Sequence, residues 1–337
     1  MKILHNASLK EYNTFGIDVK AKTFIAVENI GELREVLMQN YSEDIFILGG
    51  GSNMLLTKDI EATVLQIGLK GKEIVKETKE EVFIKVQAGE NWHETVLWTI
   101  ENNWGGLENL SLIPGNIGTA PIQNIGAYGV ELKDSFFSCE AIDIQTLEVK
   151  EFDNASCEFG YRNSIFKSSV KGKYIITSVT FGLTRKNHIL QTRYGSIQEA
   201  LDEKGITNAG IRDISNVVIG IRGQKLPDPK ILGNSGSFFK NPVIAAGELV
   251  ILQKSFPEIP SYKVSETEFK IPAGWLIERT GLKGYREGDA GVHKNQALVL
   301  VNYGSATGKE ILNLSKKVQA EVFKKFQIEL QPEVNIF

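Results

Sequence analysis

The stretch DIFILGGGSNMLL, residues 44–56, carries the clearest indication of fold in this sequence. Its first residues, 44–48, predict a short apolar strand, and the three glycines that follow predict a turn into a second strand-like run. A dinucleotide-binding fingerprint would space its glycines differently and open a helix. Because MLLTKD follows instead, we interpret GGGSN as a glycine turn of another kind, whose backbone can approach a bulky anion closely.

A second glycine-rich segment, IPGNIGTAPIQNIGAYG at residues 113–129, repeats this chemistry on a larger scale. Its glycines have no side chains that would keep a ligand away from the backbone, while its Asn, Thr and Gln side chains offer neutral hydrogen bonds. Two such loops, each leaving a strand, suit a long ligand with a diphosphate and a flat ring. On composition alone, ordinary surface turns remain the alternative.

Composition excludes several classes of protein. A chain of 337 residues with 42% hydrophobic and 23% charged residues is typical of a soluble protein of two or three domains. The net charge of -3 and the lack of a Lys/Arg run argue against nucleic-acid binding. We expect no signal peptide and no membrane insertion, because no apolar stretch is long enough. The spacing of Cys139 and Cys157 suits no zinc site, so we expect no metal, two free thiols and a reducing cytoplasm.

Local patterns predict a mixed α+β chain. Residues 81–89 alternate between apolar and polar side chains, which predicts a strand, and Asn91 is placed to cap the helix that follows. Capping boxes are expected at Ser196 with Glu199 and at Thr307 with Glu310. The last helix should bury one apolar stripe. That stripe consists of Ile311, Leu314, Val318, Val322 and Phe326.

Eight motifs, in order along nearly the whole chain, resemble the UDP-N-acetylenolpyruvoylglucosamine reductase family, the flavin-dependent Mur reductases of peptidoglycan synthesis. They are NTFGI (13–17), GGGSN (49–53), IPGNIGTAPIQNIGAYG (113–129), YRNSIFK (161–167), KLPDPKILGNSGSFFKNP (225–242), AGWLIE (273–278), HKNQALVLVN (293–302) and QPEVNIF (331–337). One glycine loop would be weak evidence, whereas this ordered set is specific.

The resemblance implies an FAD-binding domain of the vanillyl-alcohol oxidase and p-cresol methylhydroxylase type, followed by an α+β substrate-binding domain. We expect the first domain at 1–184, with subdomains of about 1–68 and 69–184, the second at 185–325, and a tail at 326–337 that returns to the active site. The expected FAD contacts are Gly49, Gly50, Gly51, Ser52, Asn53, Pro114, Gly115, Gly118, Thr119, Gln123, Asn124, Gly126, Ala127, Tyr128 and Gly129.

The implied reaction has two steps. NADPH passes a hydride to the flavin, which then reduces the enolpyruvyl ether of a UDP-sugar to give UDP-N-acetylmuramate. The resemblance makes Ser237 the proton donor, and Arg162 and Glu333 its catalytic partners. An arginine can clamp the substrate carboxylate, whereas Glu333 is either held protonated as a donor or orients Arg162 or a water. Read without the resemblance, these residues are a turn cap, a surface ion pair and a solvated tail residue.

The resemblance further implies that Lys225, Asn241 and Gln296 contact the nucleotide diphosphate. Tyr194 resembles the substrate-closing tyrosine of the loop-bearing type of the family, although it could also be a half-buried aromatic residue before a helix. Beyond the small-molecule substrate we expect no partner, and a monomer.

Two other functions stay open at this point. One is another flavoenzyme of the same FAD fold, such as an oxidase of a hydroxy acid or phenol. Those enzymes often tether the flavin through His or Tyr, and neither glycine loop contains a histidine. The other is a sugar-nucleotide binding protein without redox activity, which would keep Lys225 and Asn241 but would not need the three catalytic residues together.

Overall fold

The computed structural model describes residues 1–39, 45–194 and 196–337, which form two compact units. The first unit comprises residues 1–7, 21–50 and 60–222, and the second comprises 8–20, 51–59 and 223–337. The boundary between residues 50 and 51 divides the GGGSN loop. The predicted boundary between the FAD-binding and substrate-binding domains, near residue 184, stays a prediction. In the structure, residues 185–222 pack with the first unit.

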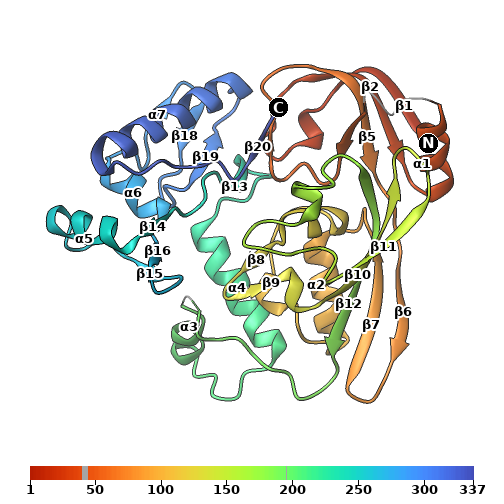
Figure 1. Cartoon of the computed structure of the whole chain (residues 1–337), viewed down its shortest axis with the longest axis horizontal. Helices are drawn as coiled ribbons and strands as arrows, with labels where there is room; N and C mark the ends of the chain where they lie inside the picture. Colours follow the sequence, from red (N-terminus) through yellow and green to blue (C-terminus); the bar gives the residue numbers. More distant parts are fainter. Residues whose placement is uncertain (40–44, 195) are drawn as a thin grey trace. The chain divides into compact units, whose positions relative to one another are not determined.

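The first unit contains two main sheets (Figure 1). A four-stranded sheet has the order β1-β2-β5-β3, in which β5 is parallel to both β2 and β3. A five-stranded antiparallel sheet has the order β11-β10-β12-β7-β6. The strands are β1 (Lys2–Ser8), β2 (Lys20–Val27), β3 (Ile45–Leu48), β5 (Ile60–Ile67), β6 (Lys72–Glu77), β7 (Glu81–Gln87), β10 (Phe136–Asp143), β11 (Val149–Asp153) and β12 (Tyr174–Thr184). Asp44, in the predicted strand 44–48, lies outside the described residues.

The alternation of buried and more exposed residues along β7 explains how this strand joins the core of the first unit. Val82, Ile84 and Val86 are fully buried on one face, as predicted from the sequence. Against this core packs α2 (Trp92–Glu101), whose Trp92 meets Phe181 of β12 edge to face at 5.9 Å. The predicted cap of α2 is confirmed, because the Asn91 side chain accepts a hydrogen bond from the Glu94 N–H.

The remaining elements of this unit are α1 (Ile30–Met38), the short pair β8 (Gly126–Ala127) and β9 (Val130–Glu131), α3 (Ile197–Glu203) and α4 (Ile211–Lys225). The predicted capping box of α3 is wrong: Ser196 is the N-cap residue, but its side chain makes no capping hydrogen bond. A capping box requires an extended backbone at the N-cap residue, whereas the Ser196 backbone (φ -94°, ψ 27°) is not extended.

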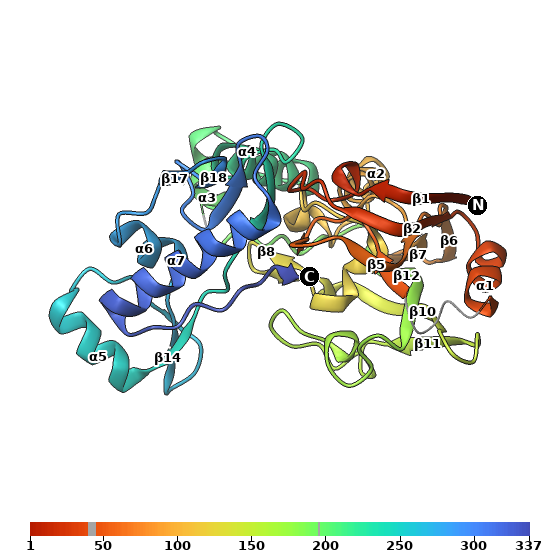
Figure 2. The same cartoon turned by 90° about the horizontal axis from the view of Figure 1, so that it is seen from above.

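The second unit is built on the antiparallel sheet β13-β19-β18-β17, against which α7 packs beside α6 (Figure 2). Its elements are β4 (Met54–Leu55), β13 (Gly233–Ser237), β14 (Val243–Ala245), α5 (Ala246–Ser255), β15 (Tyr262–Lys263), β16 (Glu268–Lys270), α6 (Ala273–Arg279), β17 (Arg286–Glu287), β18 (Ala290–Val292), β19 (Val299–Asn302), α7 (Gly308–Phe326) and β20 (Asn335–Ile336). The predicted capping box and buried stripe of α7 are both confirmed.

Both cysteines are free and buried, as expected from the sequence. A hydrogen bond that the Cys139 thiol donates to Cys157, together with burial, raises the pKa of Cys139 far above its ordinary value. Within the described residues, no helix combines the length and apolar content needed to cross a bilayer.

Candidate active site

Ser237 ends strand β13, and two buried phenylalanines follow it. Phe238 and Phe239 are fully buried, and the Phe238 N–H donates to the Leu298 carbonyl at 2.8 Å. Gly236 has a φ of +70°, a conformation that favours glycine. An irregularity of strand β13 at Gly236 on one side and an aromatic anchor on the other therefore fix the backbone that carries the Ser237 hydroxyl.

The C-terminal segment brings Glu333 to the same strand. The Glu333 N–H donates to the Phe238 carbonyl at 2.8 Å, and Phe239 forms a β-bridge with Pro332. Glu333 is thus hydrogen-bonded to the residue that follows Ser237, although these two predicted catalytic residues lie far apart in the sequence.

The second half of the GGGSN loop belongs to this assembly as well. Strand β4 pairs in parallel with β20, and the Asn335 N–H donates to the Asn53 carbonyl at 3.2 Å. Asn53 Nδ2 in turn donates to the Glu333 carbonyl at 3.4 Å. The second unit therefore gathers part of a predicted cofactor loop, the predicted proton donor and the predicted glutamate.

The two glycine-rich segments meet in the first unit. A Cβ on Gly49 would lie 2.4 Å from the Thr119 methyl group, and one on Gly50 would lie 2.9 Å from the Gly115 Cα. Such distances exclude any side chain at either glycine. The segments therefore form one thin wall of backbone, which fits the close approach of a flat, anionic cofactor such as FAD.

Arg162 lies on the same wall. Its Nη2 donates to the Gly126 carbonyl at 2.7 Å, and its guanidinium lies 5.7 Å from the Tyr161 ring centroid. Its backbone has a φ of +54°, which is uncommon for a non-glycine residue and is found more often at functional sites. The hydrogen bond fixes the guanidinium against the second glycine segment.

Asn124, a predicted FAD contact, directs its amide into the protein. Its Nδ2 donates to Glu131 Oε2 at 2.9 Å and to the Gly160 carbonyl at 3.0 Å, and its Oδ1 accepts from the Lys133 N–H. The residue is fully buried with a φ of +43°. Its side chain thus braces the second glycine segment from inside.

Tyr194 is exposed beside that segment. A Cβ on Gly129 would lie 3.0 Å from the Tyr194 Cβ, so the tyrosine side chain lies directly against this glycine. Asn109 holds the two stretches together, because its Nδ2 donates to the carbonyls of Tyr128 and Gln191 at 3.0 and 2.8 Å. Sequence reasoning did not single out Asn109, since a lone asparagine in a loop carries no distinctive signal.

Arg222, near the end of α4, is a second residue that sequence reasoning missed. Its Nε is buried and finds no hydrogen-bond partner among the residues that the structure describes. Burial lowers its pKa, and the neighbouring Arg162 lowers it further. Arg222 also lies within electrostatic reach of Tyr128 and His93. Two arginines beside one glycine segment, one of them with an unsatisfied buried nitrogen, favour an anionic ligand.

Burial raises the pKa of Tyr128, and burial followed by the charge of Arg222 lowers the pKa of His93. His93 is therefore held neutral, and its Nδ1 accepts a hydrogen bond from the Leu112 N–H at 3.0 Å. Leu112 immediately precedes the second glycine segment, so this histidine supports the loop.

The other predicted substrate residues lie in the second unit. Lys225 is exposed at the end of α4. Asn241 and Gln296 are half-buried and both contact the start of α6: Asn241 Oδ1 accepts from the Ala273 N–H at 2.9 Å, and Gln296 Oε1 lies beside Gly274. The structure thus brings these two amides to one short helix.

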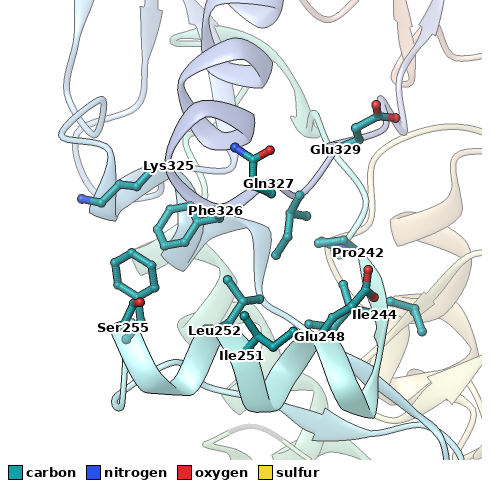
Figure 3. Close-up of a pocket in the computed structure, with 13 residues that line it drawn as sticks. Pro242, Ile244, Glu248, Ile251, Leu252, Ser255, Lys325, Phe326, Gln327 and Glu329 are labelled. Atoms are coloured by element: carbon teal, nitrogen blue, oxygen red, sulfur yellow. The ribbon is translucent and has the colours of Figure 1, made fainter.

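A separate cavity of about 460 Å³ lies between α5 and the end of α7 (Figure 3). Its lining mixes apolar residues, such as Ile251, Leu252 and Phe326, with polar and charged ones, and it contains none of the predicted site residues. Residues 1–39, 45–194 and 196–337 contain no cluster of three or more His, Cys, Asp or Glu side chains suited to a metal ion.

Residues 228–337 match the family model of the UDP-N-acetylenolpyruvoylglucosamine reductase C-terminal domain, and residues 21–150 match that of an FAD binding domain. A UDP-N-acetylenolpyruvoylglucosamine reductase of Flavobacterium johnsoniae is 62% identical to this chain over 336 residues, covering 100% of both. One of Pseudomonas aeruginosa is 45% identical over 339 residues, covering 100% of this chain and 99% of its own.

The crystal structure of UDP-N-acetylenolpyruvylglucosamine reductase from Thermus caldophilus is similar in fold, with a TM-score of 0.70 at 23% identity over 100% of this chain and 98% of its own. The predicted α+β fold class, with an FAD-binding domain and a distinct C-terminal domain, is confirmed. On these matches, the chain belongs to the UDP-N-acetylenolpyruvoylglucosamine reductase family.

Proposed function

We propose that this oxidoreductase uses NADPH and FAD to reduce UDP-N-acetyl-3-O-(1-carboxyvinyl)-glucosamine to UDP-N-acetylmuramate, in two successive hydride transfers. Support comes from family membership and from the FAD-binding domain match over residues 21–150. The observation that carries the proposal is that Glu333 is hydrogen-bonded both to Phe238, the residue after Ser237, and to the Asn53 side chain, all within one unit. We expect a cytoplasmic enzyme, because its substrate is a nucleotide sugar, and we retain the expectation of a monomer. We retain the division into FAD-binding and substrate-binding domains at residues 1–184 and 185–325.

The chemistry defines what the chain must supply. FAD, held by the two glycine-rich segments, would supply the hydride chemistry between NADPH and the methylene carbon of the enol ether. Negative charge then develops on the neighbouring carbon and its carboxylate, and the protein must hold that charge and supply a proton. Ser237 donates the proton from its hydroxyl, and its own proton is restored from water. A rigid backbone keeps this hydroxyl in position without reorganisation.

Arg162 and Arg222 have complementary tasks. Arg162, fixed by its hydrogen bond to Gly126, clamps the substrate carboxylate through its guanidinium N–H groups. Arg222 supplies a second cation, placed to hold an anionic part of the bound FAD. Glu333, whose N–H bonds to the residue after Ser237, is either held protonated as a hydrogen-bond donor or orients Arg162 or a water. Lys225, Asn241 and Gln296 bind the nucleotide part of the substrate, and Tyr194 covers it.

The decisive experiment separates the two half-reactions under anaerobic conditions. Purified protein should be yellow, NADPH should bleach it, and the enolpyruvyl substrate should restore the colour. Ser237→Ala should be bleached at the wild-type rate but should recover its colour at least about a hundredfold more slowly. Equal slowing of both phases would refute the donor role.

Ser235→Ala is the matched control on the same strand. The Ser235 hydroxyl donates to the Met54 carbonyl at 3.2 Å, so its loss should lower stability without selectively slowing the second phase. Yellow protein that ignores the enolpyruvyl substrate would contradict the proposed activity itself.

A further inference from the structure

Two side-chain amides of the second unit, Asn241 and Gln296, have their oxygen atoms occupied by backbone donors. Asn241 Oδ1 accepts from the Ala273 N–H at 2.9 Å, and Gln296 Oε1 accepts, at a longer 3.4 Å, from the Leu298 N–H. An amide whose oxygen is already bonded presents its two N–H groups to a ligand. Both amides are therefore oriented to bind hydrogen-bond acceptors, such as the oxygens of a nucleoside diphosphate.

Gly274, the second residue of α6, lies against Gln296. A Cβ on Gly274 would stand 3.2 Å from Gln296 Oε1, closer than an ordinary van der Waals contact, while its other near neighbour, the Leu298 Cβ, would be 3.8 Å away. Any side chain here would displace the Gln296 amide by a few tenths of an ångström.

The backbone gives no reason for a glycine at this position. Gly274 is absent from the residues of positive φ, and glycine within a helix is less favourable than alanine. The glycine therefore weakens α6 slightly, and the space it leaves is filled by the Gln296 oxygen. The first turn of α5 offers a comparison, because its second residue, Gly247, has open space around the corresponding Cβ.

We propose that Gly274 is a positioning residue, which seats the Gln296 amide so that its N–H groups meet an acceptor oxygen of the uridine diphosphate part of the substrate. This inference rests on the proposed function, because it takes a UDP-sugar as the ligand. The acceptor belongs either to the uracil ring or to the diphosphate, since both offer the same chemistry.

The test compares Gly274→Ala with Gly247→Ala. Both substitutions place alanine at the second residue of a helix that starts with Ala-Gly, so any general effect on helix stability is shared. Gly274→Ala should raise the Kd for UDP and the KM for the substrate about fivefold, as expected for a weakened hydrogen bond. Its kcat and its flavin reduction by NADPH should stay at wild-type values. Gly247→Ala should change none of these quantities, and a wild-type Kd for Gly274→Ala would overturn the proposal.

A double-mutant cycle tests whether the effect passes through Gln296. In a Gln296→Ala background there is no amide to displace, so adding Gly274→Ala should leave the Kd for UDP unchanged. Titration with uridine and with inorganic pyrophosphate identifies the acceptor, because only the probe that carries it should lose affinity in Gly274→Ala.

The outcomes separate this inference from the proposed function. If Gln296→Ala binds UDP like the wild type while the enzyme still turns over the enolpyruvyl substrate, the positioning role is refuted and the reductase activity stands. A persistent effect of Gly274→Ala in the Gln296→Ala background would likewise refute it. Failure of the wild-type protein to reduce the substrate would instead refute the function on which it rests.

Discussion

Replacing Arg222 by methionine should have opposite effects on the stability of the apoprotein and on its affinity for FAD. The Arg222 Nε is buried without a hydrogen-bond partner among the described residues, and burial lowers the pKa of this side chain. In the apoprotein the charged guanidinium of Arg222 therefore lowers the free energy of unfolding, because no hydrogen bond from Nε to a described residue compensates its burial. With an anion bound, the same cation becomes a binding group.

The two magnitudes follow from these surroundings. Exchange of a buried ion pair or triad for well-packed apolar residues of similar volume is often neutral or stabilises a protein by about 1–4 kcal/mol. Because the Arg222 side chain is only half-buried, we expect about 1–2 kcal/mol for the apoprotein. The lost charge-assisted hydrogen bond corresponds to about 1.5–3 kcal/mol, or a roughly 10- to 150-fold higher Kd for FAD.

Urea unfolding of flavin-free protein and titration with FAD, followed by flavin fluorescence, measure both quantities. Arg212→Met is the matched control, because Arg212 is exposed on the same helix and its replacement should change stability by less than about 0.5 kcal/mol. The reasoning is refuted if Arg222→Met apoprotein is less stable than the control and binds FAD as tightly as the wild type.

Two further predictions concern the backbone at Gly51 and the charge of His93. Gly51 has a φ of +61°, and its Cβ would lie 2.0 Å from the Tyr12 carbonyl oxygen, whereas Gly16 has a φ of +65° with nothing within 4 Å. Gly16→Ala should therefore lose only about 1–2 kcal/mol of unfolding free energy in urea, and Gly51→Ala several kcal/mol more; equal losses would contradict the steric argument. Because the lowered pKa of His93 favours its neutral form on folding, its contribution to stability should be complete above about pH 6.5 and disappear as the pH falls through the lower pKa of the folded state. Thermal melts from pH 8 to pH 5 should accordingly show a smaller acid loss for His93→Gln than for the wild type, and parallel profiles would disprove this account.

Local patterns were sufficient to predict several elements. The α7 stripe and its capping box follow from helical periodicity, and the β7 core face follows from alternation. These signals are contained in short windows of sequence, where one physical rule operates. Ser237 was assigned as the proton donor from the resemblance to the family, because its local pattern alone indicates only the cap of a turn.

Other features depend on contacts between distant segments. The pairing of β20 with β4 joins the C-terminal segment to Met54 and Leu55, far away in the sequence, and no local pattern specifies it. Arg222 resembles any polar residue of an amphipathic helix until folding buries its Nε. Asn124 was predicted as an FAD contact from its residue type, but its partners within the protein become visible only in the folded chain.

The two buried cysteines make this protein convenient for spectroscopy. Thiol reagents attack the thiolate, and the raised pKa of Cys139, together with the complete burial of Cys157, keeps both sulfurs unreactive in the native state. A single cysteine introduced on the surface of each compact unit would thus be labelled selectively in the otherwise native protein. Fluorescent or spin labels at two such sites would report the separation of the units as each ligand is added.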